Sequence, residues 1–160
     1  TSFKRILVPT DFGPASDAAL ERAVALASAF GAELTVLHVY ASPVYAYPGA
    51  PFIPLEDITI SLEKSARAGI DTVVRQLRPR VSKVSGLLRQ GSAWRQISDV
   101  AHEIGADLIV LGTHGRHGVP RALIGSVAEK VVRMSPIPVL TVHADPSSRD
   151  GGLNETRTSA

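Results

Sequence analysis

The sequence predicts an α/β protein built on a five-stranded, parallel, doubly wound sheet with helices on both faces. Short runs rich in β-branched residues alternate along the chain with longer segments whose apolar residues recur at helical spacing. Two of the short runs, Ile6–Val8 and Leu108–Leu111, are apolar throughout, which is typical of central parallel strands covered on both faces. Because strands and helices alternate, right-handed crossovers connect the strands and the sheet is parallel.

The predicted strands are short segments separated by turn residues or helical patterns. They are Phe3–Val8, Glu33–Val39, Val81–Arg89, Asp107–Leu111 and Ile137–Val142.

Helical patterns fill the intervals between the first four strands. The first helix lies between Pro14, which suits a first helical turn, and Gly31, which suits the position just past a helix end. Its apolar residues at helical spacing are Leu20, Ala23, Val24, Ala27 and Phe30. The second helix lies somewhere within Leu55–Leu77.

The last two helices are marked by their ends. The third follows Ser92, its predicted N-cap, and ends at Gly105. The fourth runs from about Ser126 to Met134, where Ser126-x-x-Glu129 has the form of a capping box.

Two segments fall outside this plan. Ala41–Pro54 carries four prolines with Tyr45, Tyr47 and Phe52 among them, and we interpret it as an irregular loop that forms a lid or contacts a partner. Residues 145–160 are polar and are predicted to be a disordered tail. The folded domain therefore spans residues 1–144.

Composition mostly excludes classes of protein. The chain has 160 residues, the length of one domain, with 17 basic and 15 acidic side chains. A net charge of +2 without a basic stripe argues against a nucleic-acid binder. The lack of cysteine excludes disulfides, thiol catalysis and cysteine-ligated metals. Since no apolar run approaches the roughly 18 residues of a membrane span and no signal-peptide core is present, we expect a soluble cytoplasmic protein.

A glycine-rich segment follows the fourth strand. It runs from Gly112 to Gly118, and Gly125-Ser126 then opens the last helix. In a doubly wound sheet, ligands bind beyond the carboxyl ends of the strands, and glycines there let the backbone approach a ligand. The N-terminus of a helix suits phosphate, and Arg116 could add positive charge. From composition alone, a phosphate site and a simple tight turn are both open.

Asp11 ends a second distinctive stretch, Pro9-Thr10-Asp11, which follows the first strand. Its carboxylate could accept hydrogen bonds from ribose hydroxyls or from the amino group of a base. The alternative is that Asp11 caps the helix that follows.

Several blocks of the chain together resemble a known family. The spacing Gly112-x2-Gly115-x9-Gly125-Ser126 is accompanied by Ile6–Phe12, Asp107–Arg116 and Ser135–Leu140. These residues resemble the universal stress protein family over Phe3–His143, and the glycine spacing matches that of its ATP-binding subgroup in full.

The resemblance implies an adenosine-nucleotide-binding α/β fold with strand order 3-2-1-4-5 and a universal stress protein domain over residues 1–144. It also implies ATP as ligand, with Mg or Mn held through the phosphates. Asp11 would lie against the adenosine, the main chain of Val39 would bond adenine, and Ser126 would help hold the phosphates. The full set of site residues that it implies is Pro9, Thr10, Asp11, Val39, Leu111, Gly112, His114, Gly115, Arg116, Gly125, Ser126 and Val127.

The last strand, Ile137–Val142, suggests an assembly. As the last strand it would lie at a sheet edge, where an apolar strand needs a partner. In the family this strand pairs with its copy across a two-fold axis, so the resemblance implies a homodimer.

We therefore expect a nucleotide sensor or signalling module of the stress response, together with an unidentified protein partner. No nucleophile–base–orienter set is visible in the sequence, so we do not expect an enzyme. His114 and His117 lack further ligands for a metal site. The alternatives are a stress protein that acts through protein contacts of the 41–54 loop without nucleotide, and a slow ATP hydrolase. ATP, ADP, AMP and a cyclic nucleotide remain open as the ligand.

Overall fold

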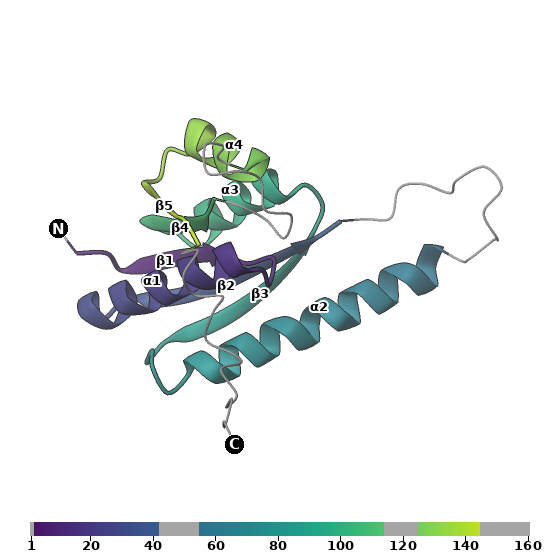
Figure 1. Ribbon diagram of the computed structural model, residues 1–160, viewed down its shortest axis with the longest axis horizontal. Helices are drawn as coiled ribbons and strands as arrows, with labels where there is room; N and C mark the ends of the chain where they lie inside the picture. Colours follow the sequence, from purple (N-terminus) through teal and green to yellow (C-terminus); the bar gives the residue numbers. More distant parts are fainter. Residues whose placement is uncertain (1, 42–54, 114–124, 145–160) are drawn as a thin grey trace, which may run out of the picture.

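The computed structural model describes residues 2–41, 55–113 and 125–144 (Figure 1). The predicted loop after Ala41, the tail 145–160 and the site residues His114, Gly115 and Arg116 lie outside the described residues. The elements in chain order are β1 (Arg5–Pro9), α1 (Pro14–Phe30), β2 (Glu33–Tyr40), α2 (Leu55–Leu77), β3 (Val84–Gln90), α3 (Ala93–Glu103), β4 (Leu108–Gly112), α4 (Ser126–Met134) and β5 (Val139–Val142).

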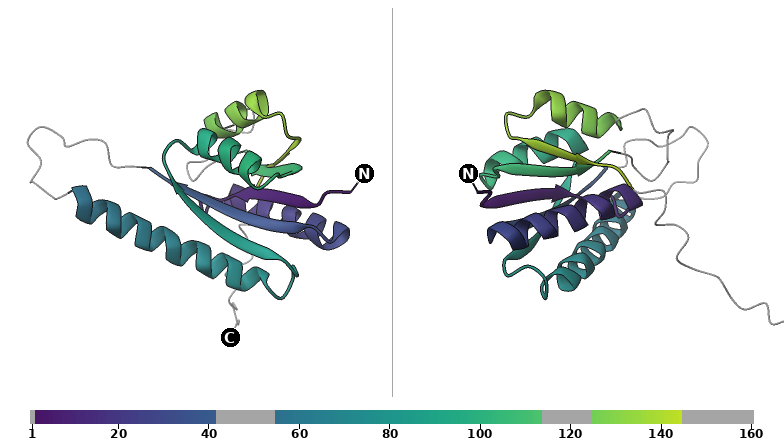
Figure 2. Two further views of the ribbon diagram at one scale, coloured as in Figure 1. Left: turned by 180° about the vertical axis from the view of Figure 1, so that it is seen from behind. Right: turned by 60° about the vertical axis from the view of Figure 1, so that its left-hand side comes forward.

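All five strands form one parallel sheet in the order β3-β2-β1-β4-β5. The predicted strand order and fold class are thereby confirmed. Helices α1 and α2 cover one face of the sheet and α3 and α4 cover the other (Figure 2). No helix in the described ranges is both long enough and apolar enough to cross a membrane.

The central strand β1 is buried on both faces. Ile6 and Val8 pack in the core beneath α1 and α2, whereas Leu7 packs beneath α3 and α4, and all three are 0% exposed. This two-sided burial explains the uninterrupted apolar runs of β1 and β4, because side chains alternate between the faces of a strand.

Strand ends differ from the predicted ones where backbone groups have other partners. The N–H groups of Arg80 and Val81 bond to the Leu77 carbonyl at 2.8 and 3.0 Å. They complete the last turn of α2, so β3 begins at Val84. At β5 the strand begins at Val139 rather than Ile137, because Pro138 has no N–H to donate. Its carbonyl still accepts the Ile109 N–H at 2.9 Å.

The predicted positions of the helix ends are confirmed, but the predicted side-chain capping bonds are not formed. Gly31 takes the left-handed conformation at φ 66° past α1, and Gly105 takes φ 61° past α3. Ser92 occupies the N-cap position of α3, but its side chain makes no capping bond. The capping box at Ser126 is wrong, because Gly125 is the N-cap of α4 and Ser126 already lies in the first turn.

Gly86 in β3 lets α2 pack closely on the sheet. A β-carbon at this position would overlap Cγ2 of Ile70 and would lie 2.9 Å from Cγ2 of Val74. Both neighbours are buried core residues, so they have little room to move.

We predict that Gly86→Val lowers the free energy of unfolding by roughly 1–3 kcal/mol, the usual cost of overpacking a filled core. Urea unfolding followed by circular dichroism measures the change. Ser85→Val, on the neighbouring exposed position, is the matched control and leaves the midpoint nearly unchanged. Equal midpoints for the two variants would show that α2 is not tightly seated on β3.

Candidate functional site

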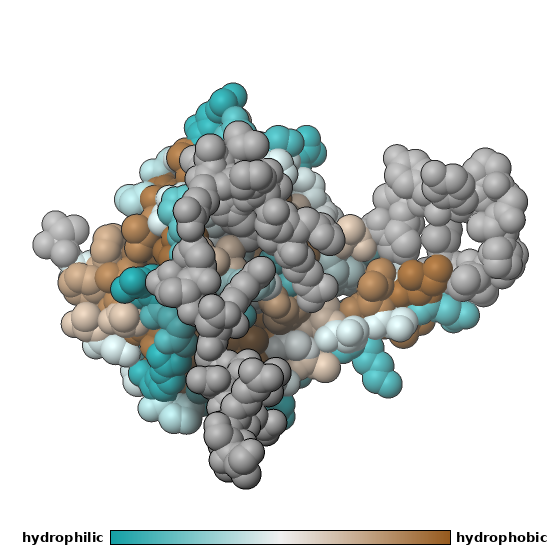
Figure 3. All heavy atoms as spheres, in the orientation of Figure 1, coloured by the Kyte–Doolittle hydropathy of each residue, from teal (hydrophilic) through white to brown (hydrophobic). Residues whose placement is uncertain are grey.

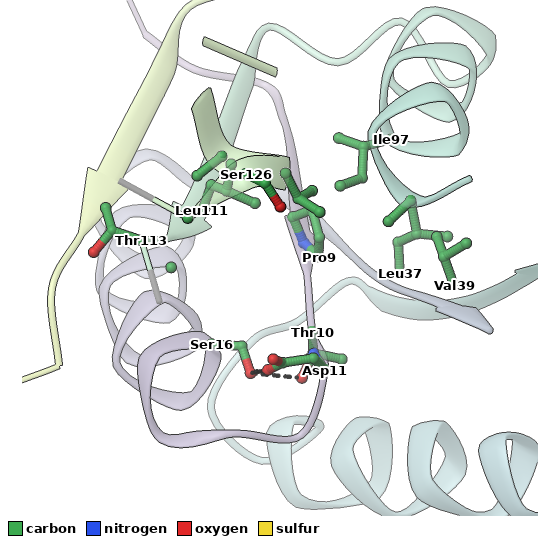
Figure 4. A pocket seen from close by; sticks show the side chains of 15 residues that line it. Pro9, Thr10, Asp11, Ser16, Leu37, Val39, Ile97, Leu111, Thr113 and Ser126 are labelled. Atoms are coloured by element: carbon green, nitrogen blue, oxygen red, sulfur yellow. Dashed lines mark hydrogen bonds between the residues drawn. The ribbon is translucent and has the colours of Figure 1, made fainter. Parts of the chain in front are cut away.

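A cavity of about 230 Å³ opens at the carboxyl ends of β1, β2 and β4 (Figure 4). The chain leaves β1 toward β2 on one side, whereas β4 is its neighbour on the other side. This is the reversal of strand order at which doubly wound sheets bind ligands. The lining residues are Pro9, Thr10, Asp11, Ser16, Leu37, Val39, Ala93, Ile97, Leu111, Gly112, Thr113, Gly125, Ser126, Val127 and Ala128.

One wall of the cavity is apolar. Leu37 and Val39 from β2 lie beside Ile97 from α3 (Figure 4). Leu37 and Ile97 are buried in the core on the α3 and α4 face, which fixes their side chains. An apolar slot of this kind suits a flat, weakly polar group such as a purine ring.

The backbone of Val39 faces the same space. The Leu37 carbonyl points toward β1 and accepts the Thr10 N–H at 2.8 Å. Alternate residues of a strand direct their N–H and C=O groups to the same side, so those of Val39 also point toward β1. Strand β1 ends at Pro9, and the Val39 groups therefore face the space beyond its end. They can bond the edge of a ring that enters the slot.

Asp11 is held in a fixed orientation. Its Oδ1 accepts a hydrogen bond from the Ser16 hydroxyl at 2.8 Å (Figure 4) and a second one from the Gly13 N–H at 3.0 Å. Gly13, not Asp11, is the N-cap of α1, so Asp11 braces the helix start as an Asx turn. Among the described residues no hydrogen bond reaches its Oδ2. Asp11 is therefore not the N-cap that the sequence left open, although its Oδ1 supports the start of the helix.

The negative charge of Asp11 affects Asp17, which lies in the first turn of α1. The pKa of Asp17 is raised above its ordinary value, first by partial burial and then by the negative charges of Asp11 and Glu21. At this end of the cavity the Asp11 carboxylate can accept hydrogen bonds from donors such as hydroxyl or amino groups.

The turn that carries Asp11 depends on a contact with α2. Phe12 has a left-handed φ of 59°, which is uncommon for a residue with a side chain. Its ring lies 4.4 Å from the His38 ring, centroid to centroid, and directly against Gly69, where an added β-carbon would lie 2.7 Å from it. His38 Nδ1 also donates to the Thr10 carbonyl at 2.7 Å. Sequence reasoning missed this support, because it joins segments far apart in the chain.

The opposite wall is made of backbone. Helix α4 begins at Ser126, and its first bond within the helix runs from the Glu129 N–H to the Gly125 carbonyl. The N–H groups of Ser126, Val127 and Ala128 therefore have no acceptor within the helix. All three residues line the cavity, and together with the helix dipole they suit an anion.

The end of β4 is tied to both neighbouring segments. The Thr113 carbonyl accepts the Gly125 N–H, and the Thr113 N–H bonds to the Val142 carbonyl at 3.0 Å. At Gly112 a β-carbon would lie 2.6 Å from the carbonyl carbon of Ala15. Gly112 is therefore required for the packing of β4 against α1, whatever the cavity holds.

The structure gathers most of the predicted site residues around this cavity. Those that line it are Pro9, Thr10, Asp11, Val39, Leu111, Gly112, Gly125, Ser126 and Val127. Sequence reasoning missed Ser16, Leu37, Ala93, Ile97, Thr113 and Ala128. In the sequence these residues resemble ordinary core or first-turn positions. Only their nearness to the carboxyl end of a strand, or to the start of a helix, could have marked them.

The cavity offers few metal ligands of its own. Within residues 2–41, 55–113 and 125–144, no three His, Asp or Glu side chains come together in a way that would hold a metal ion.

Comparison with known proteins places the chain in a family. The model of the universal stress protein family matches residues 2–143. A universal stress protein of Thermus aquaticus is 37% identical over 140 residues, which cover 88% of this chain and 98% of the relative. Universal stress protein MJ0531 of Methanocaldococcus jannaschii is 33% identical over 146 residues, covering 88% and 82%.

Solved structures agree with this assignment. Universal stress protein UspA from Lactobacillus plantarum superposes with a TM-score of 0.78 at 27% identity, covering 89% of this chain and 99% of that one. A universal stress protein family member from Burkholderia pseudomallei gives 0.70 at 27% identity, covering 87% and 95%. From the family model, the sequence relatives and the shared fold, we conclude that the chain belongs to the universal stress protein family.

Proposed function

We propose that the chain binds an adenine nucleotide, ATP, in this cavity and acts as a nucleotide-sensing module of a stress response. The observation that carries the proposal is the composition of one cavity. It joins an apolar slot at Leu37 and Ile97, an oriented carboxylate at Asp11, and three N–H groups at the start of α4 that have no acceptor within the helix.

The adenine, the ribose and the phosphates would each contact a different part of the cavity. The adenine enters the slot and bonds the main chain of Val39, and the ribose hydroxyls donate to Asp11. The phosphates lie against Gly125, Ser126 and Val127. Figure 4 shows the Ser126 hydroxyl pointing toward Pro9 across this space. A nearly neutral chain can hold a polyanion in this way, because backbone N–H groups supply the attraction. Mg or Mn would then be held through the phosphates.

Two structural neighbours indicate which nucleotides to test. One universal stress protein structure is a complex with cAMP, with a TM-score of 0.64 at 24% identity. A family protein from Arabidopsis thaliana has AMP bound, with a TM-score of 0.60 at 19% identity. At these identities the likeness is one of fold, so the proposal for this chain depends on its own cavity.

We predict that ATP stabilises the native protein. A ligand present at 100 times its dissociation constant adds about 2.7 kcal/mol, which raises the melting temperature of a chain of this size by about 5–10 °C. Thermal melts with Mg-ATP, ADP, AMP and cAMP measure the shift. If none of them shifts the melt, the alternative of a stress protein acting through protein contacts is favoured.

Gly125→Val is the control for this melt. Gly125 has φ −57°, which valine also adopts, so the change does not strain the backbone. Its isopropyl group fills the space of the phosphates, and valine is a poorer N-cap, at a cost of about 1 kcal/mol. We expect a slightly lower melting temperature without ligand and no shift with ATP. A full shift in this variant would place the nucleotide elsewhere.

We propose binding without turnover. Thr113 lines the cavity and its hydroxyl lies 2.7 Å from His143 Nδ1, an arrangement that could activate a nucleophile. Figure 4, however, shows the Thr113 hydroxyl turned toward β5 and away from Pro9 and Ser126. The hydroxyl is therefore directed away from the proposed phosphates.

Phosphate release from ATP should accordingly be no faster with the wild type than with Gly125→Val. A malachite green assay over several hours measures it. Release above that background, if abolished by Thr113→Val, would make the protein a slow hydrolase that uses the Thr113–His143 pair.

We also propose a homodimer through β5, which forms an edge of the sheet. Leu140 on this strand is 40% exposed. The carbonyls of Pro138 and Val142 bond to β4, so the backbone groups of Val139 and Thr141 point outward from the edge. These outward groups can pair with the same strand of a second copy.

Thr141→Pro should yield a folded monomer, because an edge strand tolerates proline where its N–H faces outward. Leu140→Pro is the contrasting variant: it removes an N–H that faces β4 and should lower the melting temperature. Size-exclusion chromatography with light scattering gives the mass. A wild type with the mass of two chains and a Thr141→Pro variant with the mass of one are expected. A dimeric Thr141→Pro variant would rule out pairing through β5.

A further inference from the structure

A second cavity adjoins the first. It has a volume of about 330 Å³ and lies between the start of α3 and one side of α4. Its lining residues are Trp94, Ser126, Glu129, Lys130, Arg133 and Met134. Of the residues proposed to hold the nucleotide, only Ser126 lines this second cavity.

The two cavities meet at Ser126. This residue lines both of them. On the α3 side, Ala93 lines the first cavity and the next residue, Trp94, lines the second. Ser126 and the Ala93–Trp94 pair therefore lie at the boundary between the two cavities.

Lys130 extends toward this junction. Ser126, Lys130 and Arg133 are spaced four and then three residues apart, so they share one side of α4. The rise from Ser126 to Lys130 is about 6 Å, and side chains on a helix tilt toward its N-terminus. The long Lys130 side chain consequently extends back over the turn that begins with Ser126.

Lys130 has no acidic partner within residues 2–41, 55–113 and 125–144. Arg133, by contrast, pairs with Glu129 at 3.0 Å. Its ammonium lies 5.9 Å from the centroid of the Trp94 ring, and the Arg95 guanidinium carbon lies 5.2 Å from the same centroid. Residues 114–124 contain no acidic side chain. This wall of the second cavity therefore carries an excess of positive charge.

We propose that Lys130, held against Trp94, binds the terminal phosphate of the nucleotide and gives the site a preference for triphosphate over monophosphate. The inference rests on the proposed nucleotide site. A single phosphate is satisfied by the N–H groups of Ser126, Val127 and Ala128 and ends in the first cavity. A longer phosphate chain passes Ser126 and meets the ammonium in the second. The ligand class that this arrangement selects is a nucleoside triphosphate.

Trp94 reports this contact. It is the only tryptophan in the chain, and a phosphate bound by Lys130 changes the position of a cation beside the ring. Binding of ATP should therefore change the tryptophan emission, whereas AMP should leave it nearly unchanged.

Isothermal titration calorimetry with AMP, ADP and ATP tests the proposal. The wild type should bind ATP about tenfold more tightly than AMP or better, the usual size of one hydrogen bond to a charged group. Lys130→Gln should lower this ATP-to-AMP affinity ratio by about tenfold, and Lys130→Arg should keep most of it. Lys64→Gln is the matched control, because it removes the same charge from an exposed site on α2 and should keep the wild-type ratio.

The outcomes separate the two proposals. Equal affinities of the wild type for AMP and ATP, or an unchanged ratio in Lys130→Gln, would overturn the role of Lys130 and leave the nucleotide site standing. A fall of the ratio in Lys64→Gln as large as in Lys130→Gln would show that net charge sets the preference, which also overturns it. Failure of the wild type to bind any of the three nucleotides would overturn the proposed function itself, and this inference with it.

Discussion

Burial of β1 and β4 on both faces determines where a ligand can bind in this protein. Strands covered on both faces need helices above and below the sheet, and here α1 and α2 lie on one face whereas α3 and α4 lie on the other. All carboxyl ends then lie at one edge. Between β1 and β4, neighbouring strands continue to opposite sides of the sheet, and side chains do not fill the space that opens there. The cavity is thus a consequence of the same apolar pattern that builds the core. Its apolar wall is held in place because Leu37 and Ile97 are themselves packed in that core.

The sequence was sufficient for the fold because its strongest signals are apolar runs. The alternation of strands and helices predicted a parallel, doubly wound sheet, and the resemblance to the universal stress protein family implied the strand order that the structure has. The predicted strand ends were less accurate, because the ends depend on individual hydrogen bonds such as those from the Arg80 and Val81 N–H groups to the Leu77 carbonyl. The capping box at Ser126 was wrong because a residue pattern alone does not say which residue carries the cap torsions.

Some residues of the candidate site could be recognised from the sequence and others could not. Residues in loops, such as Asp11 and Gly125, stand out in a sequence because polar residues and glycine interrupt a pattern. Leu37 and Ile97 do not, because a residue that lines a cavity and a residue that fills a core have the same chemistry. The contact of Phe12 with Gly69, which supports the Asp11 turn, could not be predicted from the sequence either. It depends on where α2 lies on the sheet, a property of the whole fold.

Glycine at position 112 does not by itself indicate that a family member binds a nucleotide. Because β4 passes so close to Ala15 that no β-carbon fits, every protein with this approach needs glycine there, with or without a ligand. A glycine at that position is therefore a marker of architecture. Gly125 has a φ of −57°, which suits any residue, and it lines the cavity. Its replacement by a bulky residue in a related chain would be the more informative sign that the proposed phosphate site is lost.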